Sequence, residues 1–167
     1  MNLHEFNTLT LERAREELLR CCGCVRWAGV VLEARPFKDK PELLAVSDAA
    51  WARMGESDWL EAFSHHPRIG GKDALRAKYA ATRDLALVEQ AGAAAASEAV
   101  LEALAKGNAD YEKKFGHIFI VCATGKSAVE MLDLLKSRLW NAAATELRLA
   151  AGEQNKITKI RLETLIP

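Results

Sequence analysis

Apolar residues recur every three or four positions along almost the whole chain, and strict alternation of apolar and polar residues is nearly absent. Leu11, Ala14, Leu18 and Cys22 form one such stripe, which places them on one face of a helix. Only 4 prolines interrupt the 167 residues, so long helices can persist. We therefore expect an all-α fold, a compact bundle of about eight helices forming a single domain over residues 1–167.

Capping and breaking residues set the expected ends of these helices. Thr10 can cap the first helix, and Ser127 with Glu130 forms a capping box before a later one. Gly107 is expected to end a long alanine-rich helix, and Gly152 weakens the expected continuity of the last helix. The expected helical segments cover residues 11–22, 24–35, 41–54, 58–63, 74–82, 84–107, 108–115, 127–139 and 141–160.

The same patterns select the side chains expected in the core. Large aromatic residues are normally buried, and apolar residues at helical spacing form the inward face. The expected core includes Leu44, Ala45, Trp51 and Met54 in the third helix, Leu147, Ala150, Ile157 and Ile160 in the last helix, and the aromatic residues Trp27, Trp59, Trp140, Phe63 and Phe119.

One segment departs from the helical pattern. The run HIFIVCA, residues 117–123, is rich in β-branched and aromatic residues, which favour extended backbone. It is short and no partner strand is evident. We expect a buried extended segment or the start of a buried helix.

Charge and composition exclude several classes of protein. Lys and Arg total 23 and Asp and Glu total 23, so the chain lacks the basic excess typical of nucleic-acid or membrane-surface partners. No apolar run of about 18 residues occurs, and the first residues are charged and amphipathic, unlike a signal peptide. A cytoplasmic location with reduced cysteines is expected. Cys21, Cys22 and Cys24 have no second ligand pair, so they are expected to be small buried thiols.

The most unusual segment is His65-His66-Pro67-Arg68-Ile69-Gly70-Gly71. Pro67 keeps His66 out of helical geometry, which presents one histidine at a helix end. Histidine is the natural proton-transfer group near neutral pH. From these residues alone, a catalytic histidine and a packed polar turn are equally good interpretations.

Two other polar positions interrupt apolar patterns, and each alone is better explained as solvated surface. Glu89 and Gln90 interrupt an alanine-rich helix, and Arg161 lies between Ile160 and Leu162. A half-buried arginine favours a carboxylate or an anionic ligand. The sequence TGKS at 124–127 lacks the first glycine of a phosphate-binding loop, so it is expected to be a loop and a helix cap.

An ordered set of motifs resembles one family. The set is HHPRIGG, then VEQAG, then the run from Asn108 through Tyr111 and Lys114-Phe115-Gly116 to Phe119-Ile120, then Arg138-Leu139 with Asn141, then Lys156-Ile157 with Ile160-Arg161-Leu162. It is similar to the 2-oxo-4-hydroxy-4-carboxy-5-ureidoimidazoline (OHCU) decarboxylases of urate degradation. Phe6-Asn7, Cys21-Cys22 and Arg35-Pro36-Phe37 fit as well. No single motif is decisive, but the order is specific and covers nearly the whole chain.

The resemblance implies an all-helical homodimer that needs no metal or organic cofactor and converts OHCU into (S)-allantoin and CO2. It places the family's catalytic histidine on His66, which precedes the proline. It places the other catalytic residues on Glu89 and Arg161. The implied substrate-binding residues are Pro67, Gln90, Phe119, Ile120, Val121, Cys122 and Ala123, the last five acting largely through their backbone.

One position departs from the family, and two other functions compete. Family members often carry a serine where this chain has Ala86, so a hydroxyl contact to the ligand is lost or supplied elsewhere. The chain could instead be a non-catalytic helical interaction module with HHPRIGG as its binding loop. It could also be a metal-dependent hydrolase using His65, His66 and a carboxylate.

Overall fold

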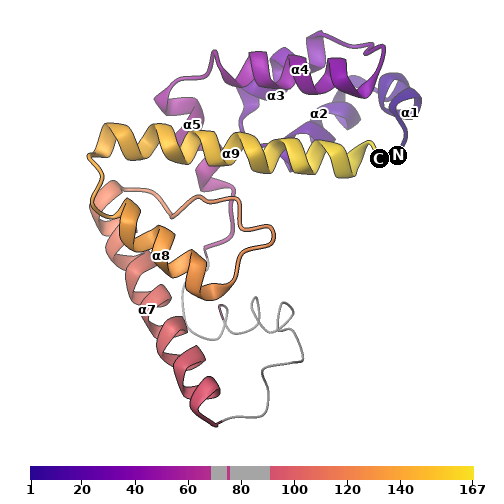
Figure 1. Cartoon of the computed structure of the whole chain (residues 1–167). Helices are drawn as coiled ribbons and strands as arrows, with labels where there is room; N and C mark the ends of the chain where they lie inside the picture. The colour runs from indigo at the N-terminus through magenta and orange to yellow at the C-terminus, as the bar shows by residue number, and fades with distance from the viewer. Residues whose placement is uncertain (69–74, 76–90) are drawn as a thin grey trace. The chain divides into compact units, whose positions relative to one another are not determined.

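The computed structural model describes residues 1–68, 75 and 91–167, and all the regular secondary structure in that part of the chain is helical (Figure 1). This confirms the expected all-α class. The helix expected over 74–82 and the beginning of the one expected over 84–107 lie outside the described residues, except for the helical and buried Leu75. The described helices are α1 (Leu3–Thr8), α2 (Leu11–Cys21), α3 (Val25–Glu33), α4 (Lys40–Trp51), α5 (Glu56–Ser64), α7 (Ala91–Phe115), α8 (Ala128–Arg138) and α9 (Ala143–Leu165).

Internal contacts divide the chain into two compact units. Unit 1 contains residues 1–66, 120–122 and 148–167, and unit 2 contains residues 67–119 and 123–147. The first residues of α9 therefore belong to unit 2 and the rest of that helix to unit 1. That all 167 residues act as a single domain stays a prediction.

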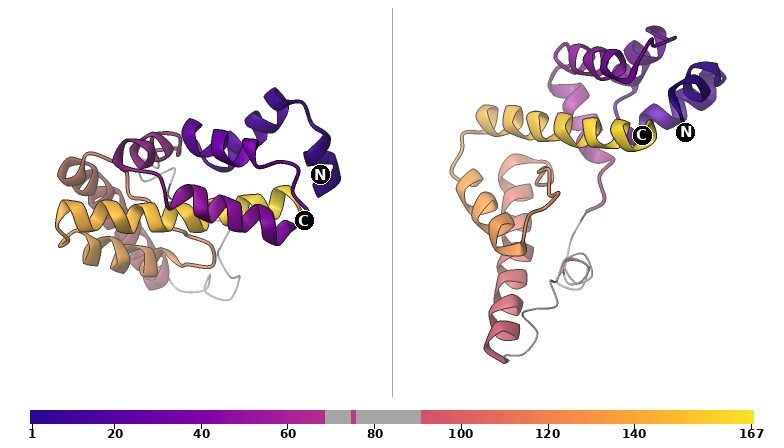
Figure 2. Two further views of the ribbon diagram at one scale, coloured as in Figure 1. Left: turned by 90° about the horizontal axis from the view of Figure 1, so that it is seen from above. Right: turned by 45° about the vertical axis from the view of Figure 1, so that its right-hand side comes forward.

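In unit 1, α4 lies alongside α9 (Figures 1 and 2). Two buried tryptophans, Trp27 and Trp51, pack in this unit. Trp27 is fully buried, and its indole N–H donates to the carbonyl of Ser47 at 3.2 Å. The indole N–H of Trp51 donates to the carbonyl of Ala151 on α9 at 2.9 Å. Each buried indole N–H thus finds a backbone acceptor, which removes the cost of burying an unpaired donor.

Two helix faces in unit 1 differ from those expected. On α4 the buried residues are Leu43, Ser47, Ala50 and Trp51, whereas Leu44 is half-buried and Ala45 exposed. The expected burial of Leu44 and Ala45 was therefore wrong, whereas that of Trp51 and Met54 is confirmed. The apolar pattern favours Leu44 and Ala45 as core residues. In the structure, however, α3 and α9 cover the side of α4 that carries Ser47. The carbonyl of Ser47 accepts a hydrogen bond from Trp27 on α3.

The inward face of α9 is more polar than expected. The helix is continuous through Gly152, and in the part of it that belongs to unit 1 the buried positions are Ala150, Ala151, Gln154, Thr158 and Leu162. Only Ala150 of the four expected residues is buried. Leu147 and Ile157 are half-buried and Ile160 is 38% exposed. The face is set by polar partners from distant parts of the chain, which an apolar pattern cannot detect.

In unit 2, α7 continues past Gly107 instead of ending there. A Cβ atom at Gly107 would lie 2.6 Å from Leu135 Cδ2 on α8, so this glycine allows two helices to approach closely. The helix ends at Phe115, and Gly116 follows with φ +75°. That left-handed conformation is the usual helix terminator. The C-cap expected at Gly107 was therefore wrong by nine residues.

Half of the expected aromatic core is confirmed, and one of its residues is clearly exposed. Trp27, Trp51 and Phe63 are buried, and Trp59 and Phe119 are half-buried. Trp140 is 89% exposed because it lies in the turn after α8, where no helical face directs it inward. Its expected place in the core was wrong.

The segment 117–123 forms neither a helix nor a strand, as expected for an extended stretch. His117 and Ile120 are buried and the other five residues are half-buried. In unit 2, the rings of His117 and Phe119 pack edge-on against Tyr111, with centroids 5.5 and 5.1 Å away. The alternative of a helix start is therefore wrong, and the segment is less completely buried than predicted.

Candidate active site

His66 lies just past the end of α5, in unit 1. The helix ends at Ser64, and the backbone N–H of His66 still donates to the carbonyl of Phe63 at 3.1 Å. Pro67 follows and prevents the helix from continuing. The chain thus presents His66 from a fixed turn at a helix end, as its sequence predicts.

The ring of His66 is held by a buried amide on α9. His66 Nε2 lies 2.5 Å from Oε1 of Gln154, whose side chain is fully buried. The amide nitrogen of Gln154 donates to Thr158 Oγ1 at 3.1 Å and faces Cys22 Sγ at 4.0 Å. The Thr158 hydroxyl donates in turn to the backbone carbonyl of Gln154 at 3.0 Å. This network connects the end of α5 to α9 and to the end of α2.

Burial lowers the pKa of His66 below its usual value near 6.5. The positive charges of Arg161 and His65 lower it further, and the hydrogen bond with Gln154 opposes them in part. Desolvation disfavours the charged imidazolium, and the nearby guanidinium of Arg161 adds repulsion. His66 is therefore neutral near pH 7 and can accept a proton there.

Arg161 lies seven residues after Gln154 on α9, which is two helical turns along the same side of the helix. Its Nη1 donates to the carbonyls of Cys21 at 3.2 Å and Arg20 at 3.4 Å. These carbonyls end α2, where the helix dipole favours a cation. Both bonds use one nitrogen of a group that carries five N–H donors.

The part of the extended segment that belongs to unit 1 is also attached to α9. The backbone N–H of Cys122 donates to Glu153 Oε2 at 2.7 Å, and Lys156 Nζ lies 2.5 Å from Glu153 Oε1. Glu153 precedes Gln154, so two consecutive residues of α9 position the Ile120–Cys122 backbone and His66.

Five of the predicted site residues therefore belong to unit 1 and are organised around α9: His66, Arg161, Ile120, Val121 and Cys122. Pro67, Phe119 and Ala123 belong to unit 2. Glu89 and Gln90 lie outside the described residues, as does Ala86, so their predicted places are not tested.

Sequence reasoning missed Glu153, Gln154 and Thr158. The available signal was the pair of polar residues at 154 and 158, one turn apart on the side of α9 that carries Ala150 and Ala151. Polar groups buried at this spacing are usually hydrogen-bonded to one another or to a third group.

The cysteines near this network are buried, free thiols, as predicted. Burial raises the pKa of Cys22 to about 12 and that of Cys21 to about 11. Both are protonated near neutral pH, and a protonated thiol is a poor nucleophile. Cys22 thus acts as a neutral packing group beside Gln154.

A second, buried charged cluster lies in unit 2. Glu146 is fully buried and accepts from the Tyr111 hydroxyl, from Arg138 Nε at 2.7 Å and from Asn141 Nδ2 at 2.7 Å. Lys114 Nζ donates to the carbonyls of Leu139 and Asn141. Four residues of the family motifs therefore form hydrogen bonds within unit 2. They are Tyr111, Lys114, Arg138 and Asn141.

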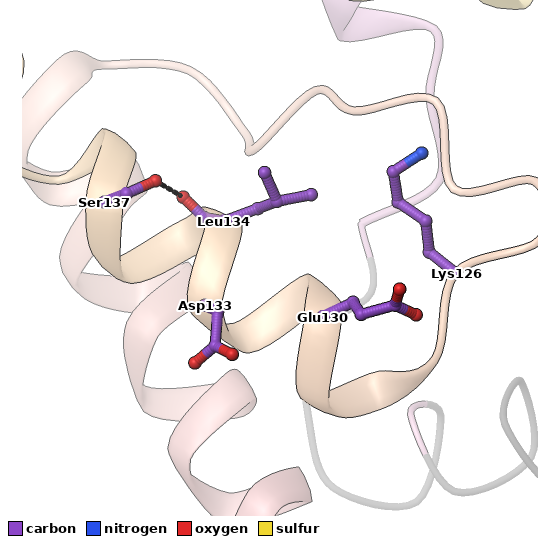
Figure 3. Close-up of a pocket in the computed structure, with 5 residues that line it drawn as sticks. All are labelled: Lys126, Glu130, Asp133, Leu134 and Ser137. Carbon is purple, nitrogen blue, oxygen red and sulfur yellow. Dashed lines mark hydrogen bonds between the residues drawn. The ribbon is translucent and has the colours of Figure 1, made fainter.

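A surface pocket lies elsewhere in unit 2, along α8 (Figure 3). Its lining residues are Lys126, Glu130, Asp133, Leu134 and Ser137, none of which was predicted to bind substrate. Glu130 completes the capping box with Ser127, and these hydrogen bonds lower its pKa. The expected loop and cap at TGKS are confirmed, with Gly125 at φ +74° in the loop.

In the part of the chain that the structure describes, no group of three or more His, Cys, Asp or Glu residues is placed to hold a metal ion. No helix among residues 1–68, 75 and 91–167 is both long enough and apolar enough to span a bilayer.

Two known proteins match the chain over nearly its whole length. The chain is 35% identical over 94% of its length to the uric acid degradation bifunctional protein TTL of Arabidopsis thaliana, of which it spans only 48%. It is 27% identical over 99% of its length to the 2-oxo-4-hydroxy-4-carboxy-5-ureidoimidazoline decarboxylase of Amia calva, covering 95% of that protein.

A solved structure and a family model extend the comparison. A crystal structure of an OHCU decarboxylase in the presence of (S)-allantoin superimposes with a TM-score of 0.72 and 36% identity, over 90% of this chain and 96% of that one. The family model described as OHCU decarboxylase matches residues 7–163. The chain is a member of the OHCU decarboxylase family.

Proposed function

We propose that this chain converts OHCU into (S)-allantoin and CO2 in urate degradation, with His66 in proton transfer and Glu89 and Arg161 positioning the substrate. Family membership supports the reaction. The observation that carries the residue roles is the contact of His66 Nε2 with Gln154 Oε1 at the end of α5, with Arg161 on the same helix as Gln154.

The reaction requires the protein to orient the substrate and to transfer a proton. The substrate carries a carboxylate on a carbon that also bears a hydroxyl and lies beside a C=N bond. When CO2 leaves, the electrons of the broken C–C bond can flow into the C=N bond. The nitrogen of that bond takes up a proton, which leaves an enol. The enol then gains one proton at the ureido carbon from a single face as its hydroxyl loses one. The site must therefore align the breaking bond with the π-system and move a proton with defined geometry.

A neutral histidine suits the proton transfer. Because its pKa is lowered, His66 can accept the hydroxyl proton and then deliver a proton to carbon. Its fixed turn before Pro67 limits the directions from which it can reach the substrate, which favours one stereochemical outcome. Pro67 itself would line the pocket beside this ring.

The remaining predicted residues would bind the substrate. Arg161 can bind a carboxylate or carbonyl oxygen through guanidinium donors that α2 does not use. Glu89 would orient His66 or hold the ureido N–H groups, and Gln90 would bind beside it. The backbone of Phe119, Ile120, Val121, Cys122 and Ala123 would hydrogen-bond the amide-like edges of the ring.

Assembly and location complete the proposal. A homodimer in the cytoplasm that uses no metal or organic cofactor is what the resemblance implies for this chain. Sedimentation of the purified chain, together with metal analysis, tests the oligomeric state and the cofactor requirement.

The test of the activity is circular dichroism of (S)-allantoin formation. The substrate is generated from urate with urate oxidase and hydroxyisourate hydrolase, and this chain is then added. A fast rise of the signal supports the proposal. A rise that matches the control without this chain would overturn it.

The matched variants for this assay are His66→Ala and His65→Ala. Loss of proton transfer typically costs about 10²–10⁴-fold in rate, so His66→Ala should lose most of its turnover while far-UV circular dichroism stays unchanged. His65→Ala removes the exposed neighbouring imidazole and should stay within a few-fold of the parent. Near-normal turnover in His66→Ala would refute the assignment.

A further inference from the structure

The orientation of the Gln154 amide is fixed by its other contacts. Thr158 uses its only hydroxyl hydrogen on the backbone carbonyl of Gln154, so its oxygen is an acceptor toward the side-chain amide. That amide atom is therefore the NH2 nitrogen. Cys22 Sγ, the second neighbour of the same nitrogen, is a weak acceptor.

With the nitrogen turned toward Thr158 and Cys22, the amide oxygen faces His66. An amide oxygen only accepts hydrogen bonds. At 2.5 Å from Oε1, the Nε2 atom of His66 must therefore carry a hydrogen. In a neutral imidazole the other nitrogen, Nδ1, is then unprotonated and is the proton acceptor.

We infer that Gln154 is a positioning residue that selects the neutral form of His66 with its proton on Nε2, which leaves Nδ1 to exchange protons with the ligand. A neutral amide that accepts the N–H raises the pKa of the ring only in part, and burial still leaves that pKa below its usual value. A carboxylate at the same place would stabilise the imidazolium and remove the base.

The other charged and titratable groups around His66 agree with this role. His65 lies on the same turn, Arg161 comes from α9, and Cys22 lies at the end of α2 as a protonated thiol. None of these described neighbours supplies a negative charge that would hold the ring as a cation. The part of the inference that concerns catalysis rests on the proposed function, whereas the part that concerns the tautomer does not.

Nuclear magnetic resonance of the full chain with ¹⁵N-labelled histidine tests the tautomer directly. The chain has 4 histidines, and the spectrum of His66→Ala identifies the signals of His66. We expect the neutral ring to show a protonated Nε2 and an unprotonated Nδ1. Gln154→Glu should raise the pKa of His66, and Gln154→Met should lower the fraction of rings protonated at Nε2.

Asn155→Asp is the matched control because it makes the same amide-to-acid change at the next residue. Asn155 donates to Asp48 at 2.9 Å rather than to His66. A neutral His66 protonated on Nδ1, or the same His66 pKa in Gln154→Glu as in Asn155→Asp, would overturn the inference.

Activity separates this inference from the proposed function. If both hold, the acid limb of kcat/KM moves to higher pH in Gln154→Glu. In Gln154→Met, kcat falls at least about tenfold while KM changes little, as for other residues that orient a histidine. If the resonances behave as expected but His66→Ala decarboxylates normally, the tautomer assignment stands and the proposed role of His66 fails.

Discussion

Gly23 and His65 approach so closely that a Cβ atom on the glycine would lie 2.4 Å from both Cβ and Cγ of the histidine. Gly23 follows α2, directly after Cys22, and His65 immediately precedes the proposed catalytic residue His66. The absence of a side chain at Gly23 therefore determines how near the end of α5 can come to the end of α2.

We expect Gly23→Ala to displace the His65–His66 turn. Overpacking of this kind typically costs about 1–3 kcal/mol, and the moved turn would lengthen the contact between His66 and Gln154. Urea unfolding should show the loss of stability, and the allantoin assay should show reduced turnover.

Gly29→Ala is the control for this prediction. A Cβ atom at Gly29, inside α3, would meet nothing within 4 Å, so the added methyl group should stabilise the helix by about 0.5–1 kcal/mol. Equal effects of the two substitutions would show that the contact with His65 does not matter.

Local signals in the sequence predicted helix ends well. Thr10 caps α2 by accepting from the backbone N–H of Arg13, and Ser127 caps α8 with Glu130 as partner. These hydrogen bonds join residues three positions apart, so both partners can be recognised within a short stretch of the sequence. The family motifs likewise pointed to His66 and Arg161, which the structure places in unit 1.

Features that depend on distant residues could not be predicted in the same way. Gly107 is a helix breaker by local rules, yet it lies inside α7 because Leu135 of α8 requires the space. Gln154 has a polar side chain of a kind usually found at the surface, and its contacts with His66 and Cys22 explain its burial. A single sequence does not reveal which segments contact one another. These contacts determine the position of Gly107 inside α7 and the burial of Gln154.

The lowered pKa of His66 predicts a pH dependence of stability. Between the folded pKa and about 6.5, the unfolded chain binds more protons at this site than the folded chain does. The free energy of unfolding should therefore fall as the pH drops through that window. Above the window, His66 should not change the free energy of unfolding with pH.

Urea unfolding between pH 7.5 and 5.5 measures this effect. His66→Gln removes the titrating group and should flatten the part of the slope that His66 causes. His4→Gln changes an exposed histidine on α1 and should leave the slope as it is. Parallel slopes for the parent chain and His66→Gln would contradict the prediction.

The buried pair of Arg138 and Glu146 predicts a large loss of stability when one partner is removed. Arg138 is 8% exposed and Glu146 is fully buried, with Arg138 Nη2 2.5 Å from Glu146 Oε1. Arg138→Met leaves the carboxylate buried without its cation, which typically costs about 3–5 kcal/mol.

Arg13→Met tests whether that cost comes from burial. Arg13 and Glu16 lie 3.8 Å apart on the surface, where ion pairs contribute about 0–1 kcal/mol. Urea unfolding should therefore separate the two variants by more than about 2 kcal/mol. Similar small losses in both would mean that the Tyr111 and Asn141 hydrogen bonds alone sustain the buried Glu146.

The hydrogen bond from Cys122 to Glu153 predicts which part of the extended segment is most rigid. A bond to a charged acceptor contributes about 1.5–3 kcal/mol, so Glu153→Ala should speed hydrogen–deuterium exchange at the Cys122 amide by about 10–100-fold. Lys156→Ala removes only the exposed cation on the other carboxylate oxygen and should change this exchange little. If the backbone of residues 120–122 binds substrate as proposed, Glu153→Ala should also raise KM more than it lowers kcat, because the binding surface loosens while His66 keeps its contact with Gln154. Unchanged exchange at Cys122 would show that packing around Ile120, rather than this hydrogen bond, holds the segment in place.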